Sequence, residues 1–306
     1  MFGISFLPIT SYTHHNLIIL SARNMNNLKL VSHNLLDKYP SGSTVNYLNN
    51  RFYIMGDDAS EIIVLNKALQ EEERIAVFTK GSSLRSEKKT KADIEASLIV
   101  SHANAECILF FGSGSLTPHR DSAFLFNPIT KAIEKIDYSQ FYYHLRSHFS
   151  QLNIEAATLV NGHFLLGIRA NTSNPNNFLA VTSSSVFAPL YKRKIEIKLP
   201  SAHAIGISGM DYDEANDRLF ITFSSEDTSN TFDDGKVGDS YLAIVEDVKR
   251  KLANPILTPD SLIKLADVDV AFKEQKIEGI TVIASKQLLL VADDDLGNTR
   301  IFNLNF

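Results

Sequence analysis

The feature that most constrains the fold is a short opening motif that occurs three times along the chain. A polar residue, isoleucine, glutamate and a small residue stand at Asp93–Ala96, Asn153–Ala156 and Lys276–Gly279. Each motif is followed by an apolar run, a turn and a second apolar run, which is the pattern of paired β-strands. A chain made of copies of one such unit is predicted to repeat one small sheet.

Similar units open near residues 42, 93, 153, 207 and 276. They hold up to four apolar runs, separated by turns such as Asn161-Gly162, whose residues favour the positive φ angles of a two-residue hairpin. Repeated four-stranded sheets arranged radially form a propeller. We therefore predict an all-β fold, a β-propeller of about five blades, in a single domain over residues 1–306. A sixth blade is the variant if the N-terminal strands join a neighbour, and an open Greek-key sandwich is the alternative.

The two ends of the chain are predicted to meet. The last unit has only three apolar runs, whereas residues 1–40 contain runs that belong to no unit, at Asn16–Leu20 and Leu28–Ser32. Pairing of an N-terminal strand with the C-terminal blade would close the ring and remove two open sheet edges. Outside the strands we expect short helices near Phe141–His148 and Asp260–Ala266, and a long acidic loop over Ser224–Asp239.

The composition of the chain excludes some classes of binding partner. With 44% hydrophobic and 21% charged residues the chain is an ordinary globular one, and no apolar run is long enough to span a membrane. The formal charge is −5 and the basic residues are dispersed, which argues against nucleic acid. The apolar N-terminus lacks the positive segment of a signal peptide, so we expect a cytoplasmic protein, or a periplasmic one if a leader has been removed.

The repeated glutamates Glu95, Glu155 and Glu278 are the first candidates for chemistry. The innermost strands of a propeller line a central channel, so residues at equivalent positions of those strands converge. Three carboxylates brought together repel one another unless a cation, arginines or shared protons neutralise them. Hard oxygen ligands suit Ca²⁺ or Mg²⁺. The alternative is that each glutamate caps backbone amides and recurs only because the unit recurs.

Further side chains follow the second strands of several units. Asp57 with Asp58 and Asp293 with Asp294 are expected to adjoin in a closed ring, as metal ligands or a general base, although acidic turn residues are common. Arg120 and Arg169, with Asn171 nearby, could neutralise the carboxylates or bind an anionic substrate, and surface ion pairing is the alternative. His119 has a side chain suited to general-base work, with a solvent-exposed loop position as the alternative.

These motifs resemble those of an uncharacterised bacterial propeller family of the Bacteroidetes type, related loosely to phytase-like and esterase-like propellers. The resemblance rests on the three glutamate motifs and on Gly56–Ser60, Gly112–Ser115 and Ala292–Thr299, and it covers the chain from about residue 41 onward. The chain is similar also to metal-dependent lactonase propellers, in which a glutamate on the first strand of a blade binds the metal. The resemblance implies a propeller with a metal ligand at one or more of these glutamates.

The resulting hypothesis is a small-molecule site at the central channel. As a metal-dependent hydrolase of an ester, lactone or phosphoester, it would use Glu95, Glu155, Glu278 and Asp294 as ligands. Glu155, Glu278, Asp58 and His119 would then be the catalytic residues, and the arginines and Asn171 would bind an anionic ligand. The alternative is a non-catalytic propeller that binds a ligand or a protein, with structural glutamates. Whether the chain is an enzyme stays open at this point.

Overall fold

Five sheets make up the protein in the computed structural model, which describes residues 27–78, 90–171, 173–200, 205–226, 237–293 and 297–306. The first sheet contains β2 (Gly42–Leu48), β3 (Arg51–Gly56), β4 (Glu61–Leu65) and β5 (Glu71–Ala76). The second contains β6 (Ile94–His102), β7 (Ala105–Gly112), β8 (Ser122–Phe126) and β9 (Ile133–Asp137). The third contains β10 (Ile154–Val160), β11 (His163–Ile168), β12 (Asn177–Ser183), β13 (Tyr191–Ile197) and, parallel to β13, the short β17 (Ile256–Leu257).

The fourth sheet is built from β14 (Gly206–Asp213), β15 (Arg218–Glu226), β16 (Val237–Val245) and β18 (Ser261–Lys264). The fifth is built from β19 (Lys276–Ala284), β20 (Gln287–Asp293), β21 (Thr299–Asn305) and β1 (Lys29–Leu36). Helices are few: α1 (Ser139–Arg146), α2 (Val248–Lys251) and the 3₁₀ turns η2 (Leu265–Asp267) and η3 (Val270–Phe272). Among the described residues, no helix combines the length and the apolar character that crossing a membrane requires.

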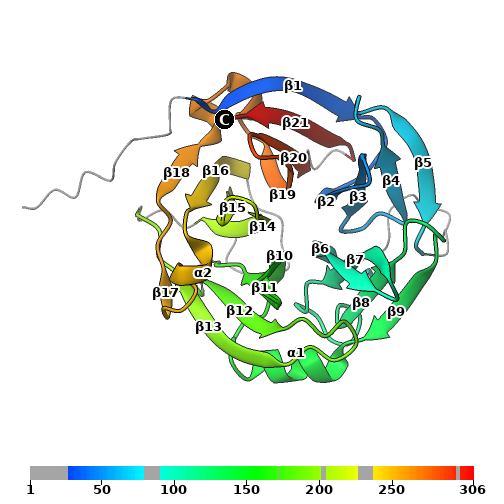
Figure 1. Cartoon of the computed structure of the whole chain (residues 1–306), viewed down its shortest axis with the longest axis vertical. Coiled ribbons are helices and arrows are strands. Elements are labelled where there is room, and N and C mark those ends of the chain that lie inside the picture. Colours follow the sequence, from blue (N-terminus) through cyan, green and yellow to red (C-terminus); the bar gives the residue numbers. More distant parts are fainter. Residues whose placement is uncertain (1–26, 79–89, 172, 201–204, 227–236, 294–296) are drawn as a thin grey trace, which may run out of the picture.

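The five sheets stand as blades around a central channel, so the predicted five-bladed propeller is confirmed (Figure 1). The strand nearest the axis is the first of each repeat, namely β2, β6, β10, β14 or β19. These five inner strands adjoin one another around the ring.

The chain ends close the ring as predicted. β1 comes from the N-terminal part of the chain and forms the outer strand of the last blade, antiparallel to β21 (Figure 1). The junction with the first blade is fastened by Thr299, whose hydroxyl donates to the Tyr39 carbonyl at 2.9 Å and accepts from the Gly42 amide at 2.8 Å. Pairing with β1 covers the backbone edge of β21, which would otherwise be open to another chain.

The apolar core is divided into five clusters, and each cluster lies between two successive blades. One example packs Leu109 and Phe111 of the second blade against Phe164 and Leu166 of the third, with α1 contributing Tyr142. The other four clusters join blades three and four, four and five, five and one, and one and two. Each blade is therefore buried on both faces, and the inward residues of its strands alternate between two cores.

Three expectations from the sequence need correction or restriction. The helix predicted over Asp260–Ala266 is wrong: residues 261–264 form β18, because the edge of β16 offers backbone partners from Tyr241 to Ile244. The loop predicted over Ser224–Asp239 is shorter, since β15 continues to Glu226 and β16 begins at Val237. The strand predicted at Asn16–Leu20 lies outside the described residues.

Candidate functional site

A β-bulge interrupts the pairing of every inner strand near its first residues. At this end of the inner strands the register shifts at one residue in each blade, and these five bulge residues are Ser43, Glu95, Glu155, Ser208 and Glu278. A bulge re-aims the side chain of the extra residue relative to the alternating pleat. The three repeated glutamates thus occupy one structural position in three blades, and two serines occupy it in the others.

The three glutamates meet at the channel end where the inner strands begin. They line a void of about 20 Å³, together with Ser43, Gly209 and neighbouring backbone of all five inner strands. A volume of this size admits about one water molecule or a bare ion. The predicted convergence of Glu95, Glu155 and Glu278 is therefore present among the described residues.

Basic and amide groups accompany two of these carboxylates. Lys276 Nζ lies 2.8 Å from Glu278 Oε1. Asn153 donates to Glu155 Oε1 at 2.6 Å, and Arg169 Nη1 lies 3.8 Å from Glu155 Oε2. Arg169 also donates to the Ile207 carbonyl at 3.1 Å, so its guanidinium joins the third blade to the fourth.

The third glutamate adjoins a separate charged cluster. Among the described residues, the one group of three carboxylates with ligand atoms within 4.8 Å of each other is Asp57, Asp93 and Glu95. Lys91 pairs with Asp57 and lies 2.8 Å from Asp93, while Arg120 Nη1 lies 2.6 Å from the other Asp93 oxygen. Two basic side chains therefore already sit against these carboxylates.

Burial and mutual repulsion make two of the channel glutamates weak acids. Burial raises the pKa of Glu278 to about 8, although Lys276 opposes the shift and the Asp293 and Glu155 charges add to it. Burial likewise raises the pKa of Glu95 well above its ordinary value, with Glu155 and Asp57 next in effect. The carboxyl of Glu278 therefore favours the protonated form at neutral pH, and the pKa of Glu95 is shifted in the same direction.

The remaining predicted site residues are distributed more widely. Arg120 is buried and donates to Ser115 as well as to Asp93, so it braces the second blade beside the channel. Asn171 shapes its own loop by accepting from the Ser173 and Asn174 amides at 2.9 and 2.8 Å. His119 is exposed in the loop after β7.

The predicted aspartates also lie in different places. Asp58 is half-buried in the turn between β3 and β4. Asp293, at the end of β20, is buried close enough to Glu278 to raise its pKa. Asp294 lies outside the described residues.

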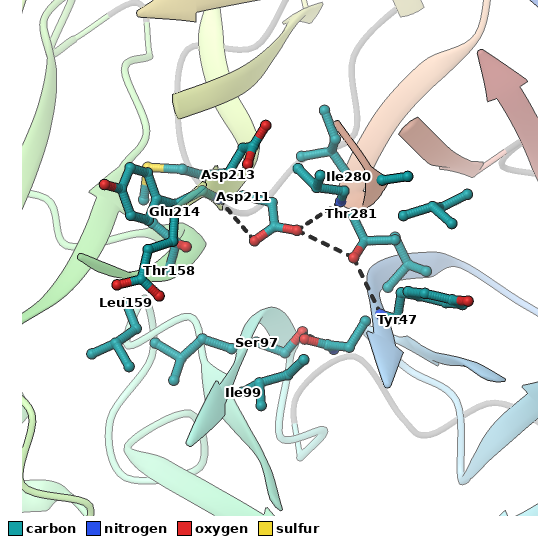
Figure 2. A pocket seen from close by; sticks show the side chains of 18 of the residues that line it. Tyr47, Ser97, Ile99, Thr158, Leu159, Asp211, Asp213, Glu214, Ile280 and Thr281 are labelled. Atoms are coloured by element: carbon teal, nitrogen blue, oxygen red, sulfur yellow. Dashed lines mark hydrogen bonds between the residues drawn. The ribbon is translucent and has the colours of Figure 1, made fainter. Parts of the chain in front are cut away.

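A much larger cavity occupies the opposite end of the channel, where the inner strands finish. Its volume is about 430 Å³, and all five inner strands line it (Figure 2). One small polar or acidic residue per strand faces this space: Asn46, Ser97, Thr158, Asp211 and Thr281. The last residue of β14, Asp213, also lines the cavity, and the turn after β14 adds Glu214 at the rim.

Hydrogen bonds tie several of these residues to each other across blade boundaries. Asn46 donates to Ser97 at 2.6 Å, and the Tyr47 amide donates to Thr281 at 3.2 Å. One Asp211 oxygen accepts from the Val282 amide at 2.7 Å and the Thr281 hydroxyl at 3.2 Å, while the other accepts from the Tyr212 amide at 2.8 Å (Figure 2). Despite these donors, burial raises the pKa of Asp211 to about 6.

The comparison that decides the family is a sequence match. A model described as a family of unknown function, DUF6929, matches residues 38–306. The chain belongs to DUF6929. The matched residues include all five inner strands of this DUF6929 chain. A search of curated proteins found no match to it.

Solved structures resemble the DUF6929 chain in fold. Glutaminyl cyclase from Myxococcus xanthus aligns with a TM-score of 0.54 at 10% identity, covering 91% of this chain and 95% of that one. Virginiamycin B lyase from Staphylococcus aureus aligns with a TM-score of 0.47 at 10% identity, covering 92% and 100%. At 10% identity the likeness to the glutaminyl cyclase shows the fold alone. The Bacteroidetes-type and phytase-like resemblance stays a prediction.

Sequence reasoning located the glutamates but missed the large cavity. Ser43 and Ser208 could have been found, since Gly42-Ser43-Thr44 and Ile207-Ser208-Gly209 open their units just as the glutamate motifs do. The lining residues of the cavity carry no shared motif. Only their position three residues or fewer beyond the bulge brings them together.

Proposed function

We propose that this chain is a non-catalytic propeller that binds a small organic molecule in the cavity where the inner strands end. The observation that carries the proposal is the cavity of about 430 Å³ built by all five inner strands. Sites for small organic ligands have volumes of about 300–1,000 Å³, with a mostly apolar lining and a few converging polar groups. Here apolar residues such as Ile99 and Leu159 stand beside a ring of polar side chains, and polar groups make up the larger part of the lining.

The charged groups at the other end of the channel support a structural role for the glutamates. Lys91 stands between Asp57 and Asp93, where a divalent cation would otherwise lie, and Lys276 and Arg169 accompany Glu278 and Glu155. A cation site holding a lysine ammonium would have to expel it before binding Ca²⁺ or Mg²⁺. Hydrolysis of an ester, lactone or phosphoester with such a metal stays a prediction.

Blocking the cavity tests the proposal. Leu159 lines it with a side chain that is 37% exposed, so Leu159→Trp would fill the mouth without disturbing an interblade core. We expect organic compounds that raise the melting temperature of the wild type to lose that effect in this variant. A ligand at about a hundred times its Kd adds about 2.7 kcal/mol of stability, which a thermal-shift assay detects.

The matched control is Leu190→Trp, because Leu190 is 68% exposed and lies outside the cavity lining. It should preserve every ligand-induced shift. Equal shifts in the wild type and in Leu159→Trp would place the ligand elsewhere and contradict the proposal.

A metal titration separates the two functions. Chelator-treated protein is melted with and without Ca²⁺ or Mg²⁺, and the proposal expects no metal-dependent rise. A selective rise that Glu155→Gln abolishes would instead favour the metal-dependent hydrolase.

A further inference from the structure

The charge of the cavity lining points to the class of ligand. We infer that the cavity takes an amphipathic organic cation, a molecule with a protonated amine joined to an apolar body; the inference rests on the proposed function. Asp211, Asp213 and Glu214 line the cavity, and no lysine, arginine or histidine is among the described residues that do so. A neutral or anionic ligand would leave this acidic lining uncompensated.

Asp211 is placed to receive the amine. Its carboxylate points into the ring of lining side chains at the centre of the channel (Figure 2). The two oxygens of an ionised carboxylate offer about four lone-pair sites. Three are occupied, by the amides of Val282 and Tyr212 and the hydroxyl of Thr281. All three are neutral donors, so they hold the carboxylate in place and leave its charge for a cation.

The two other carboxylates of the lining differ in burial and in their hydrogen-bond partners. Asp213 is buried and accepts from the Asn216 side chain at 2.6 Å, so it shapes the hairpin. Glu214 is exposed at the rim. An entering cation therefore meets Glu214 first and Asp211 deeper in the channel, which is an arrangement that concentrates positive ligands.

The rest of the lining defines the body of the ligand. Ile99 and Leu159, from β6 and β10, are the apolar side chains beside the polar ring (Figure 2). Ile280, Tyr47 and Tyr212 also border the cavity, but their side chains pack against interblade cores. The apolar surface of Ile99 and Leu159 beside the carboxylates suits one hydrocarbon or aromatic group in the ligand better than a second charge. A compact metal ion would leave most of the cavity unfilled.

The ionisation of Asp211 at physiological pH agrees with a cationic ligand. Because the pKa of Asp211 is about 6, its carboxyl is mainly ionised at pH 7.5 and mainly protonated at pH 5. The other titratable groups of the lining are Tyr212 and Asp213 of β14, Glu214 of the turn after it, and Tyr47 of β2. The lining residues of β6, β10 and β19 are uncharged. An amine ligand should therefore bind more weakly at pH 5 than at pH 7.5.

Matched probes test the inference on the full chain. We would measure binding of 2-phenylethylamine, 2-phenylethanol and 3-phenylpropanoate, which share one apolar body and differ in charge, and of hexylamine, hexanol and heptanoate. We expect each amine to bind at least about tenfold more tightly than its alcohol at pH 7.5, with no binding of the carboxylates. Calorimetry or thermal shift gives the comparison.

Variants then assign the effect to residues. Asp211→Asn should cost amine binding about tenfold and Glu214→Gln several-fold, whereas Glu106→Gln, an exposed carboxylate at the start of β7 outside the lining, should change nothing. If Asp211→Asn fails to fold, Glu214→Gln and the comparison of pH 5 with pH 7.5 decide.

Two outcomes overturn the inference and are distinguishable. Alcohols or carboxylates that bind as tightly as the amines, with binding blocked by Leu159→Trp, would leave the proposed function standing and refute the cationic class. No binder among these probes or in a wider panel of organic compounds would refute the proposed function as well.

Discussion

A single bulge residue decides which side chains of an inner strand face which core. In the second blade Ile94 packs into the cluster shared with the first blade, whereas Ala96, two residues later, packs into the cluster shared with the third. Without a bulge, residues two apart share one face of a strand. The extra residue, Glu95, reverses the faces and itself points between them toward the channel.

Replacing a bulge glutamate has a pH-dependent effect on stability. The pKa of Glu278 is about 8 in the folded protein and near its ordinary value of 4.5 in the unfolded chain, so the folded state holds the proton more tightly. The stability gained in this way is complete below about pH 4.5 and is lost as pH rises through 8. We expect the melting temperature of the wild type to fall more steeply between pH 6 and pH 9 than that of Glu278→Gln.

The control for this prediction is Glu106→Gln, whose melting curve should follow the wild type at every pH because Glu106 is exposed. Parallel curves for the wild type and Glu278→Gln would show that Glu278 does not retain its proton.

Lys91 is a second residue whose removal has a defined consequence. Lys91→Met would leave Asp57 and Asp93 without their shared ammonium, and breaking a buried ion pair costs about 3–5 kcal/mol. Lys131→Met removes an exposed pair with Glu73 and should cost less than about 1 kcal/mol. Urea unfolding of both variants measures the difference, and similar losses would mean that the Lys91 cluster is solvated.

At the scale of elements, β1 is the strand on which ring closure depends. Deleting residues 1–37 removes β1 and exposes the backbone edge of β21, which can pair with another chain. We expect a lower melting temperature and concentration-dependent oligomers, observed by light scattering after size-exclusion chromatography. Deleting residues 1–26 removes no strand of the five described sheets and serves as the control, and a monomeric, equally stable 1–37 deletion would show that β1 is dispensable.

The elements also show what the sequence predicts and what it does not. The glutamate motifs and the Asn161-Gly162 turn were sufficient for the blade pattern, because hairpin register depends on local residues. The helix predicted over Asp260–Ala266 is wrong because the four residues of β18 become a strand only through pairing with β16. The convergence of the glutamates followed from pseudo-symmetry, but their pairing with Lys91, Lys276 and Arg169 depends on side chains that no repeat relates.

Across the whole molecule, each blade shares its two cores with its neighbours, and closure makes that sharing continuous. Open repeat proteins unfold from their ends, because a terminal repeat has one neighbour. Here a blade that unfolds alone would expose two cores at once. We expect one cooperative transition, with coincident midpoints by far-UV circular dichroism and by tyrosine fluorescence, since the chain has no tryptophan. Separate midpoints would indicate that some blades unfold independently.

The ring of Asn46, Ser97, Thr158, Asp211 and Thr281 has a consequence for engineering. None of the five belongs to an interblade cluster, although each comes from a different blade and all face one cavity. A combinatorial library that randomises these five positions would therefore alter the chemistry of the channel without replacing any residue of a hydrophobic cluster. The propeller is a scaffold from which receptors for other small molecules could be selected.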